Sequence, residues 1–412
     1  MHCASRLPWT GKTYLGLLLL IWGSVTHSRA EDWPHWRGPH ANGLSSETGW
    51  NTHWPAEGPR RVWSAKVGIG FSSFAVSNGR VLTAGNHSNQ DSVFCFDEST
   101  GMLIWKHTYD CLLDPRYYDG GTSATPTTDG GRVYTLSRKG NIFALNATNG
   151  AVIWQRNLAK ELGAEIPEWG FAGSPWVEGP LLILNVGDAA TALEKETGKT
   201  RWTSGKGPSG YSAATPFDFQ GKRCVALAVH KEIVTVEVST GKKLWGHPWK
   251  TDYDINAADP VVRGNEMFIT SGYNHAGALL RLTEGAPTVV WENKLVRSQF
   301  SSPVLIEGSL YGVDANSGSD CALKCIDWAT GKLNWEKKGV GMASLMAAQG
   351  KLIVQLEKGQ LILVNASPKA YEELSRAQVL GGKCWTQPVL ANQHIYCRNS
   401  VGDVVCLDVS AK

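Results

Sequence analysis

Four residues of this 412-residue chain are candidates for binding a ligand or cofactor: Trp169, Tyr211, Asp259 and Arg297. Two are aromatic, one is a carboxylate and one is a guanidinium. In the fold derived below, each falls at or near the start of an inner strand, where side chains line the mouth of a central channel. The alternative for each is ordinary packing and solvation at that rim. No residue has a pattern that assigns it a catalytic role.

Metal and nucleophile motifs are weak in this sequence. Residues 252–256 (DYDIN) open like a calcium loop, but the central Gly is missing and Arg263 stands where a bidentate Glu would close the loop. We find no Gly-rich phosphate loop, no His-rich metal spacing and no G-x-S-x-G elbow. We therefore expect no metal site.

The elements that position the four candidates come from a repeated eleven-residue figure, seen first in residues 144–154 (ALNATNGAVIW). It has a small residue at the end of one extended run, a tight turn that ends in Gly, and a second run that ends in Trp. Gly supplies the positive φ of the turn, and Trp supplies a large apolar face. Copies occur at residues 95–105, 192–202, 235–245 and 325–335.

The spacing of the closing tryptophans predicts the fold. They are Trp63, Trp105, Trp154, Trp202, Trp245, Trp291 and Trp335, with gaps of 42, 49, 48, 43, 46 and 44 residues. Such a period, built from short strands, is typical of a β-propeller with one four-stranded sheet per blade. A degenerate eighth place falls near Leu380. We therefore predict an all-β, eight-bladed propeller of four-stranded antiparallel blades.

The ends of the chain predict how the propeller closes. Trp63 has no hairpin copy before it, while residues 405–409 (VCLDV) match the start of the figure just before the chain ends. Pairing of the N-terminal strand with the C-terminal blade would remove both exposed sheet edges. Two longer insertions, at residues 110–121 and 158–169, should lie on one face and shape the channel opening. Residues 367–374 replace the Gly turn of the seventh blade, and we expect a helical turn there.

The N-terminal region predicts export. Residues 1–30 have basic residues, a short apolar run at 13–25 and a small-x-small site that ends at Ala30, which is typical of a signal peptide cleaved after that residue. The run is shorter than the roughly 20 residues of a spanning helix, although an uncleaved anchor is the alternative. We therefore expect a periplasmic or secreted protein with no transmembrane segment after cleavage.

The remaining chain divides into an arm at residues 31–59 and a propeller at residues 60–412. The arm is rich in Trp, Pro and Gly, and we expect it to pack its tryptophans on the propeller flank. A tryptophan platform for a ligand is the alternative. The leader holds three of the 40 Lys and Arg residues and no acid, so 37 residues of each sign remain. A neutral domain without a basic run gives no case for nucleic acid, and we expect a monomer.

The figure A-x-D-x-x-T-G-x-x-x-W resembles the tryptophan-docking repeat of the pyrroloquinoline quinone (PQQ) dehydrogenase superfamily, whose propellers have eight blades. The layout of a leader and a single propeller resembles the PQQ-like repeat proteins that include the outer-membrane assembly lipoprotein of Gram-negative bacteria. The resemblance covers residues 60–412 and implies the fold. It does not imply an activity, because the repeat is a packing device.

Cofactor-binding members of that superfamily typically have adjacent cysteines that form a disulfide over the quinone, a calcium ion and an Asp base. This sequence has no Cys-Cys pair and no C-x-x-C-H motif for haem. We therefore expect a non-catalytic binding or scaffold protein of the cell envelope, with a protein or small molecule as its partner and no cofactor. One alternative is a PQQ-dependent alcohol or sugar dehydrogenase with calcium. The other is a carbohydrate or polymer binder that uses the arm tryptophans.

Eight of the nine cysteines remain after leader cleavage. Cys95, Cys325 and Cys406 occupy the slot that Ala144 fills in its own copy, so we expect buried substitutes for alanine. Cys384, Cys397 and Cys406 fall in one blade. A disulfide among these three is left open, and none of the eight has the spacing of a metal site.

Overall fold

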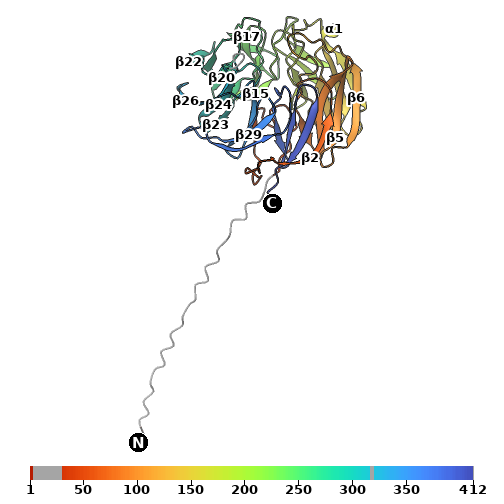
Figure 1. Cartoon of the computed structure of the whole chain (residues 1–412). Helices are drawn as coiled ribbons and strands as arrows, with labels where there is room; N and C mark the ends of the chain where they lie inside the picture. The colour runs from red at the N-terminus through yellow and green to blue at the C-terminus, as the bar shows by residue number, and fades with distance from the viewer. Residues whose placement is uncertain (3–29, 316–319, 412) are drawn as a thin grey trace.

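The computed structural model describes residues 1–2, 30–315 and 320–411 as eight four-stranded blades around a central axis (Figure 1). This confirms the predicted eight-bladed β-propeller. Residues 3–29, which carry most of the expected signal peptide, lie outside the described residues. In the described ranges, no helix has both the length and the apolar character needed to cross a membrane.

Each blade is an antiparallel meander whose first strand lies nearest the axis and whose fourth strand lies at the rim. The first two blades are β3 (Ala75–Ser77), β4 (Arg80–His87), β5 (Gln90–Asp97), β6 (Leu103–Asp110), then β7 (Thr127–Asp129), β8 (Arg132–Leu136), β9 (Asn141–Asn146), β10 (Val152–Asn157). The next two are β11 (Trp176–Glu178), β12 (Leu181–Leu184), β13 (Thr191–Glu194), β14 (Thr200–Thr203), then β15 (Thr215–Phe219), β16 (Lys222–Ala228), β17 (Glu232–Glu237), β18 (Lys243–Pro248). A short helix, α1 (Leu158–Leu162), follows β10.

The second half of the ring repeats this order. The fifth and sixth blades are β19 (Val261–Arg263), β20 (Glu266–Thr270), β21 (Gly277–Arg281), β22 (Thr288–Asn293), then β23 (Val304–Ile306), β24 (Ser309–Asp314), β25 (Ala322–Asp327), β26 (Leu333–Lys338). The seventh is β27 (Ser344–Ala348), β28 (Lys351–Gln355), β29 (Gln360–Asn365), β30 (Glu373–Gln378). The eighth is β31 (Val389–Ala391), β32 (His394–Arg398), β33 (Asp403–Asp408) and β2 (Arg60–Lys66).

The eighth blade joins the two ends of the chain, as the sequence predicts. The N-terminal strand β2 pairs antiparallel with β33, with Trp63 opposite Cys406, and Figure 1 shows β2 beside the blue C-terminal strands. An ion pair of 2.8 Å between Arg60 and Asp408 lies on this seam. Closure therefore pairs the edge that each end would otherwise expose.

The repeated tryptophans join neighbouring blades. The indole Nε1–H of Trp105 donates to the carbonyl of Ala147 in the next blade at 2.9 Å. A Cβ added to Gly150 would lie 2.6 Å from the Trp105 ring, so only glycine fits there, at a φ of +71°. The same contact recurs between Trp63 and Gly101, Trp154 and Gly198, Trp202 and Gly241, and Trp291 and Gly331.

The seventh blade has no tryptophan at this position. The register of β29 and β30 places Ser375 opposite Leu363, just before the bulge, where the other blades have Trp. The degenerate place is therefore Ser375, and the expectation of Leu380 is wrong. Residues 366–372 contain bends and no helical turn, so that expectation is also wrong. The gap from Trp335 to Ser375 is 40 residues, shorter than the 42 to 49 residues between the repeated tryptophans, so the sequence interval placed the position too late.

Residues of the arm replace the missing tryptophan. The backbone N–H of Asn51 donates to the carbonyl of Val409 at 2.6 Å, the position that a Trp Nε1 takes in sister blades. The Ser375 hydroxyl accepts from the backbone N–H of Trp54 at 3.0 Å and donates to the Thr52 carbonyl at 2.9 Å. This part of the arm, at residues 51–54, therefore fills the gap between the seventh and eighth blades.

The first part of the arm crosses the channel, so the expected place on the propeller flank is wrong for residues 33–45. Trp33 pairs with Val76 of the innermost strand β3 through two hydrogen bonds of 2.8 Å. On another side of the ring, β1 (Leu44–Ser45) pairs in parallel with β27, the inner strand of the seventh blade. Inner strands leave a free edge toward the axis, and the arm occupies some of these edges. Whether residues 31–59 form a separate domain stays a prediction.

Candidate functional site

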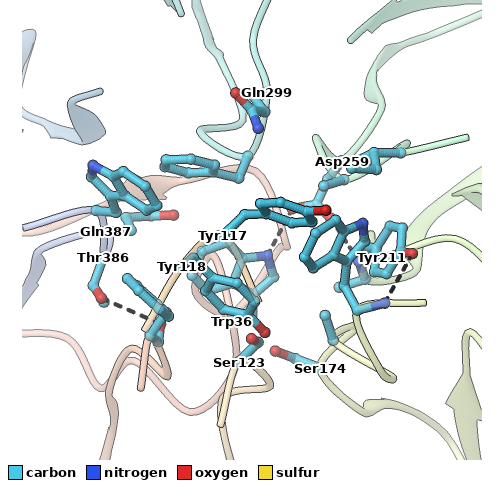
Figure 2. A pocket seen from close by; sticks show the side chains of 18 of the residues that line it. Trp36, Tyr117, Tyr118, Ser123, Ser174, Tyr211, Asp259, Gln299, Thr386 and Gln387 are labelled. Carbon is cyan, nitrogen blue, oxygen red and sulfur yellow. Dashed lines mark hydrogen bonds between the residues drawn. The ribbon is translucent and has the colours of Figure 1, made fainter. Parts of the chain in front are cut away.

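A cavity of about 290 Å³ lies at the end of the channel where the inner strands begin. Its walls come from segments just before the inner strands, and Trp36 of the arm belongs to the lining. Figure 2 shows Trp36, Tyr117, Tyr118 and Tyr211 among the side chains around this space. The volume is at the lower end of the range of small-molecule pockets, roughly 300 to 1,000 Å³.

Aromatic rings form a belt around much of the cavity. Phe71 stacks on Trp385 with centroids 5.7 Å apart and an interplanar angle of 24°. Trp385 also contacts Phe300 at 5.2 Å, and Phe71 contacts Tyr118 at 5.7 Å. Tyr118 in turn meets Trp169 edge-on at 5.8 Å. Rings that contact one another in this way are already ordered, so little side-chain entropy is lost when a ligand binds to their apolar faces.

The two long insertions supply part of the belt, as the sequence predicts. Tyr117 and Tyr118 come from the first insertion, and Trp169 ends the second. The hydroxyl of Tyr211 accepts a hydrogen bond of 3.4 Å from the backbone N–H of Trp169. Burial is the largest influence on Tyr211 and raises its pKa to about 12, so this hydroxyl is neutral at physiological pH.

Small hydroxyl residues before the inner strands connect the blades through hydrogen bonds. The backbone N–H of Ser73 donates to Thr125 Oγ1 at 3.0 Å, and that of Thr125 donates to Ser174 Oγ at 2.8 Å. The N–H of Asp259 likewise donates to Ser302 Oγ at 2.8 Å. These residues therefore join blade to blade, besides fitting the narrow centre of the ring.

Asp259 takes part in the same network through its side chain. Its carboxylate accepts hydrogen bonds from the backbone N–H of Ala213 at 2.7 Å, from Trp36 Nε1 at 2.7 Å and from Ser302 Oγ at 3.0 Å. The guanidinium of Arg37 lies 3.8 Å away. Burial raises the pKa of Asp259, and the Arg37 charge and these three hydrogen bonds oppose that rise. The carboxylate therefore binds the arm to three blades.

Arg37 anchors the arm from the opposite side of Asp259. It is 1% exposed, and its Nη2 donates to the backbone carbonyl of Pro303 at 2.8 Å and of Asn42 at 3.0 Å. Burial lowers the pKa of this guanidinium, and the charge of Asp259 raises it. The buried pair holds Trp36 at the cavity.

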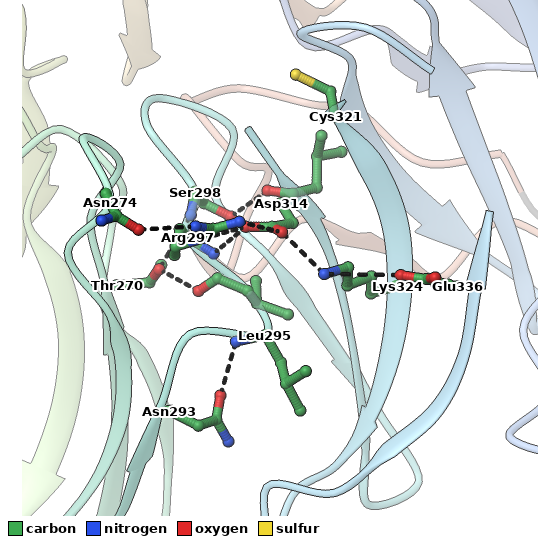
Figure 3. A network of polar contacts seen from close by, with 12 residues as sticks. Thr270, Asn274, Asn293, Leu295, Arg297, Ser298, Asp314, Cys321, Lys324 and Glu336 are labelled. Atoms are coloured by element: carbon green, nitrogen blue, oxygen red, sulfur yellow. Dashed lines mark hydrogen bonds and ion pairs between the residues drawn. The ribbon is translucent and has the colours of Figure 1, made fainter. Parts of the chain in front are cut away.

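Arg297 lies outside the cavity lining. It forms a bidentate ion pair with Asp314, with distances of 2.8 Å from Nε and 2.9 Å from Nη2, and its Nη1 donates to Asn274 (Figure 3). Lys324 adds a second cation at 2.8 Å from Asp314. Burial raises the pKa of Asp314, but the bonds from Arg297 and Lys324 outweigh it and lower that pKa. Gln299 and Phe300, close by in sequence, do line the cavity.

The structure thus brings Trp169, Tyr211 and Asp259 together at one cavity, and a binding role for all four candidates stays a prediction. Sequence reasoning missed Trp36, Phe71, Tyr118 and Trp385. An available signal was position, because each blade is preceded by a short segment of small and hydroxyl residues. Four of these segments begin with an aromatic residue of the cavity: Phe71, Tyr211, Phe300 and Trp385. Trp36 had no such signal, since the arm has no repeat.

Residues with metal-ligand chemistry are engaged elsewhere. The amide of Asn256, at the end of the calcium-like run, donates to the carbonyls of Trp249 at 2.8 Å and Val229 at 3.0 Å. Over residues 1–2, 30–315 and 320–411, no three His, Cys, Asp or Glu side chains are grouped so as to hold a metal. The eight cysteines in those ranges are buried free thiols, including Cys384, Cys397 and Cys406.

The cavity does not fit PQQ with calcium, the group that the fold family implies. That quinone carries several carboxylates, which need cationic partners. Arg116 is the cationic residue of the described lining, and it is paired with Asp114 at 3.2 Å. The acidic residue there is Asp259, whose oxygens already accept three hydrogen bonds. One guanidinium that is already paired through Nε does not match several carboxylates, and the one carboxylate of the described lining is already hydrogen-bonded.

Comparison with known proteins places the chain among propellers of this type. The sequence model of a family described as outer membrane protein assembly factor BamB matches residues 112–337. BamB of Yersinia pestis is 22% identical over 362 residues, covering 84% of this chain and 77% of that protein. Tetrathionate hydrolase of Acidithiobacillus ferrooxidans is 25% identical over 233 residues, 52% of this chain. That match spans 44% of the hydrolase, which is less than half its length.

Solved structures agree on the fold. BamB from Moraxella catarrhalis superposes with a TM-score of 0.63 at 17% identity, covering 86% of this chain and 98% of that one. Quinohemoprotein alcohol dehydrogenase from Comamonas testosteroni superposes with a TM-score of 0.68 at 15% identity, covering 92% and 81%. BamB and an alcohol dehydrogenase thus share this architecture, so the fold alone does not decide the function of this chain.

Proposed function

The chain belongs to the family described as outer membrane protein assembly factor BamB, and from that premise we propose that it is a non-catalytic binding propeller of the cell envelope. It holds a small ligand in the aromatic cavity and presents the surrounding face as a scaffold for an envelope protein. We also propose that it is exported with cleavage after Ala30, resides in the periplasm or outside the cell, and works as a monomer.

One observation carries the non-catalytic part of the proposal: the bonding of Asp259. A general base must be free to accept a proton from a substrate within hydrogen-bond reach. Asp259 accepts from Ala213, Trp36 and Ser302 and lies beside Arg37. Using it as a base would break the contact that holds the arm in the channel. The cavity thus has the walls of a binding site, and the one carboxylate of its described lining is not free to act as a base.

A PQQ-dependent dehydrogenase is the competing function, and it has a direct test. We expect calorimetric titration with PQQ and calcium to give no stoichiometric uptake at micromolar concentrations, and alcohols to give no dye reduction. Tight PQQ uptake that is lost in Asp259→Asn would contradict the proposal and place the protein among the enzymes.

The binding part is tested with a library of small neutral fragments followed by ligand-observed NMR. Fragments that stack on aromatic rings should bind the wild type and lose binding in Trp385→Ala, because Trp385 contacts both Phe71 and Phe300. Met102→Ala is the control, since Met102 is 69% exposed on the turn before β6, away from the cavity lining. Fragment binding that is equal in both variants would rule out the cavity as the site.

A further inference from the structure

The polar groups of the cavity carry unmet hydrogen-bonding capacity. Gln387 is 4% exposed and lines the cavity, and its side-chain nitrogen has no hydrogen-bond partner among the described residues. The indole Nε1 of Trp169, also in the lining, is buried and equally lacks a partner in those residues. An unpaired buried donor destabilises the fold unless it finds an acceptor. Two such donors at one cavity indicate a ligand that presents oxygen acceptors.

An acceptor and a further hydroxyl lie at the same opening. The Gln299 side-chain nitrogen donates to the Tyr273 hydroxyl at 2.8 Å, and both residues line the cavity. The amide oxygen of Gln299 therefore remains an acceptor, and the Tyr273 hydroxyl keeps its own proton to donate. The cavity therefore offers both donors and acceptors, and hydroxyl groups of a ligand can both accept from the donors and donate to the acceptors.

The charges around the cavity are compensated within the protein. Arg116 is paired with Asp114 at 3.2 Å, Asp259 with Arg37 at 3.8 Å, and Lys383 with Asp119 at 3.0 Å. A charged ligand would therefore compete with these ion pairs for its counter-charge. A quaternary ammonium would suit the rings alone but would leave the donors of Gln387 and Trp169 unpaired.

We propose that the cavity binds an uncharged saccharide, a mono- or disaccharide or the end of a glycan chain, which stacks its apolar C–H face on the aromatic belt. Its hydroxyl oxygens accept hydrogen bonds from Gln387 Nε2 and Trp169 Nε1, which requires both side chains to turn toward the ligand because both nitrogens are buried in the structure. Its hydroxyl protons are donated to the Gln299 amide oxygen. This inference rests on the proposed binding function and assigns its ligand class. The cavity volume of about 290 Å³ limits the bound part to a few rings at most.

The test is a glycan array of neutral and acidic oligosaccharides, with calorimetry on the neutral sugars that bind. We expect neutral sugars to bind, and Trp169→Phe and Gln387→Met each to weaken that binding by roughly five- to tenfold. Trp169→Phe keeps a ring in the belt and removes only the donor. Met102→Ala should leave the affinity unchanged, and thermal melts establish that each variant is folded.

Other results separate the ligand class from the binding function. Sugar affinity that is unchanged in Trp169→Phe would overturn the proposed contacts and the inference. Binding of choline, PQQ or other fragments at the cavity without any neutral sugar would overturn the saccharide class and leave the binding function in place. No cavity-dependent binding of sugars or fragments would overturn both.

Discussion

The Asp259 carboxylate accepts hydrogen bonds from three separate segments of the chain, and these bonds give it a structural role in connecting them. It precedes Pro260, at the position that Thr125, Ser174 and Ser302 take before a proline in sister blades. Those hydroxyls join blade to blade, and Asp259 does the same while also binding the arm. The repeat thus contained a signal for a connecting role. The contact with Trp36 could not be predicted, because the arm has no periodicity to place it.

The indole hydrogen bond can be tested with a matched pair of tryptophans. Trp105 Nε1 donates to Ala147 at 2.9 Å, whereas Trp245 Nε1 is buried without a partner among the described residues. Trp105→Phe should lower the free energy of unfolding by about 0.5 to 1.5 kcal/mol more than Trp245→Phe, because it removes a hydrogen bond to the partly buried Ala147 carbonyl. Denaturant unfolding of both variants measures the difference. Equal losses would mean that ring packing alone connects the blades.

At the scale of elements, the strand seam between β2 and β33 depends on ionised Asp408. Burial raises the pKa of Asp408, but hydrogen bonds from Ser410 and the Arg60 charge outweigh it and lower the pKa to about 2. The folded pKa is below the unfolded value of about 3.9. The stabilisation is therefore present above about pH 4 and is lost as the pH falls through about 2.

We expect Asp408→Asn to flatten the pH dependence of stability between about pH 4 and pH 2. Melting temperatures of wild type and variant across this range are the measurement. Asp252, an exposed residue just before the fifth blade, supplies the control Asp252→Asn away from the seam. If the wild-type and Asp408→Asn curves stay parallel in acid, the closing ion pair does not contribute.

Closure itself is tested by deletion. Removing residues 404–412 takes away all but the first residue of β33 and leaves β2 and β32 with free edges. Exposed edges pair with other chains, so we expect aggregated protein. A chain shortened by its last two residues, beyond β33, should stay soluble. Size-exclusion chromatography distinguishes the outcomes, and a soluble monomer from the longer deletion with unchanged β content would contradict closure by this strand pair.

The propeller elements could be predicted from the sequence because one physical contact recurs. Trp, Gly turn and small residue form a unit whose period counts the blades, and the unpaired Trp63 predicts the closing strand. The same regularity failed at the seventh blade, where Ser375 has no ring and backbone from residues 51–54 fills the gap. A contact between segments more than three hundred residues apart leaves no periodic trace. The path of the arm therefore had to come from the structure.

At the scale of the whole molecule, the arm acts as a strap across the ring. Residues 33–45 contact β3 of the first blade, Asp259 before the fifth, Pro303 before the sixth and β27 of the seventh. A propeller without it would depend only on contacts between neighbouring blades and on the β2–β33 seam. The strap adds contacts across the axis and forms part of the cavity. Cavity shape and fold stability are thus coupled through the same residues.

The coupling is measured by a double-mutant cycle on Arg37 and Asp259. Breaking a buried pair by removing one partner costs about 3 to 5 kcal/mol, because the other charge stays buried, and Arg37 is 1% exposed. Arg37→Met and Asp259→Asn should each lower the free energy of unfolding. The double variant should cost less than their sum, by about 1 to 3 kcal/mol.

The control cycle is Arg376→Met with Glu373→Gln, a pair on the outer strand β30 with a distance of 2.7 Å and partly exposed side chains. Partly exposed pairs contribute about 0 to 1 kcal/mol, so this cycle should give a smaller coupling. Urea unfolding with a common m-value gives both coupling energies. If the Arg37 and Asp259 losses simply add, the ion pair between them does not contribute to holding the strap. In that case Trp36 would keep its place at the cavity through its own hydrogen bond to Asp259, and Arg37→Met would leave ligand affinity unchanged.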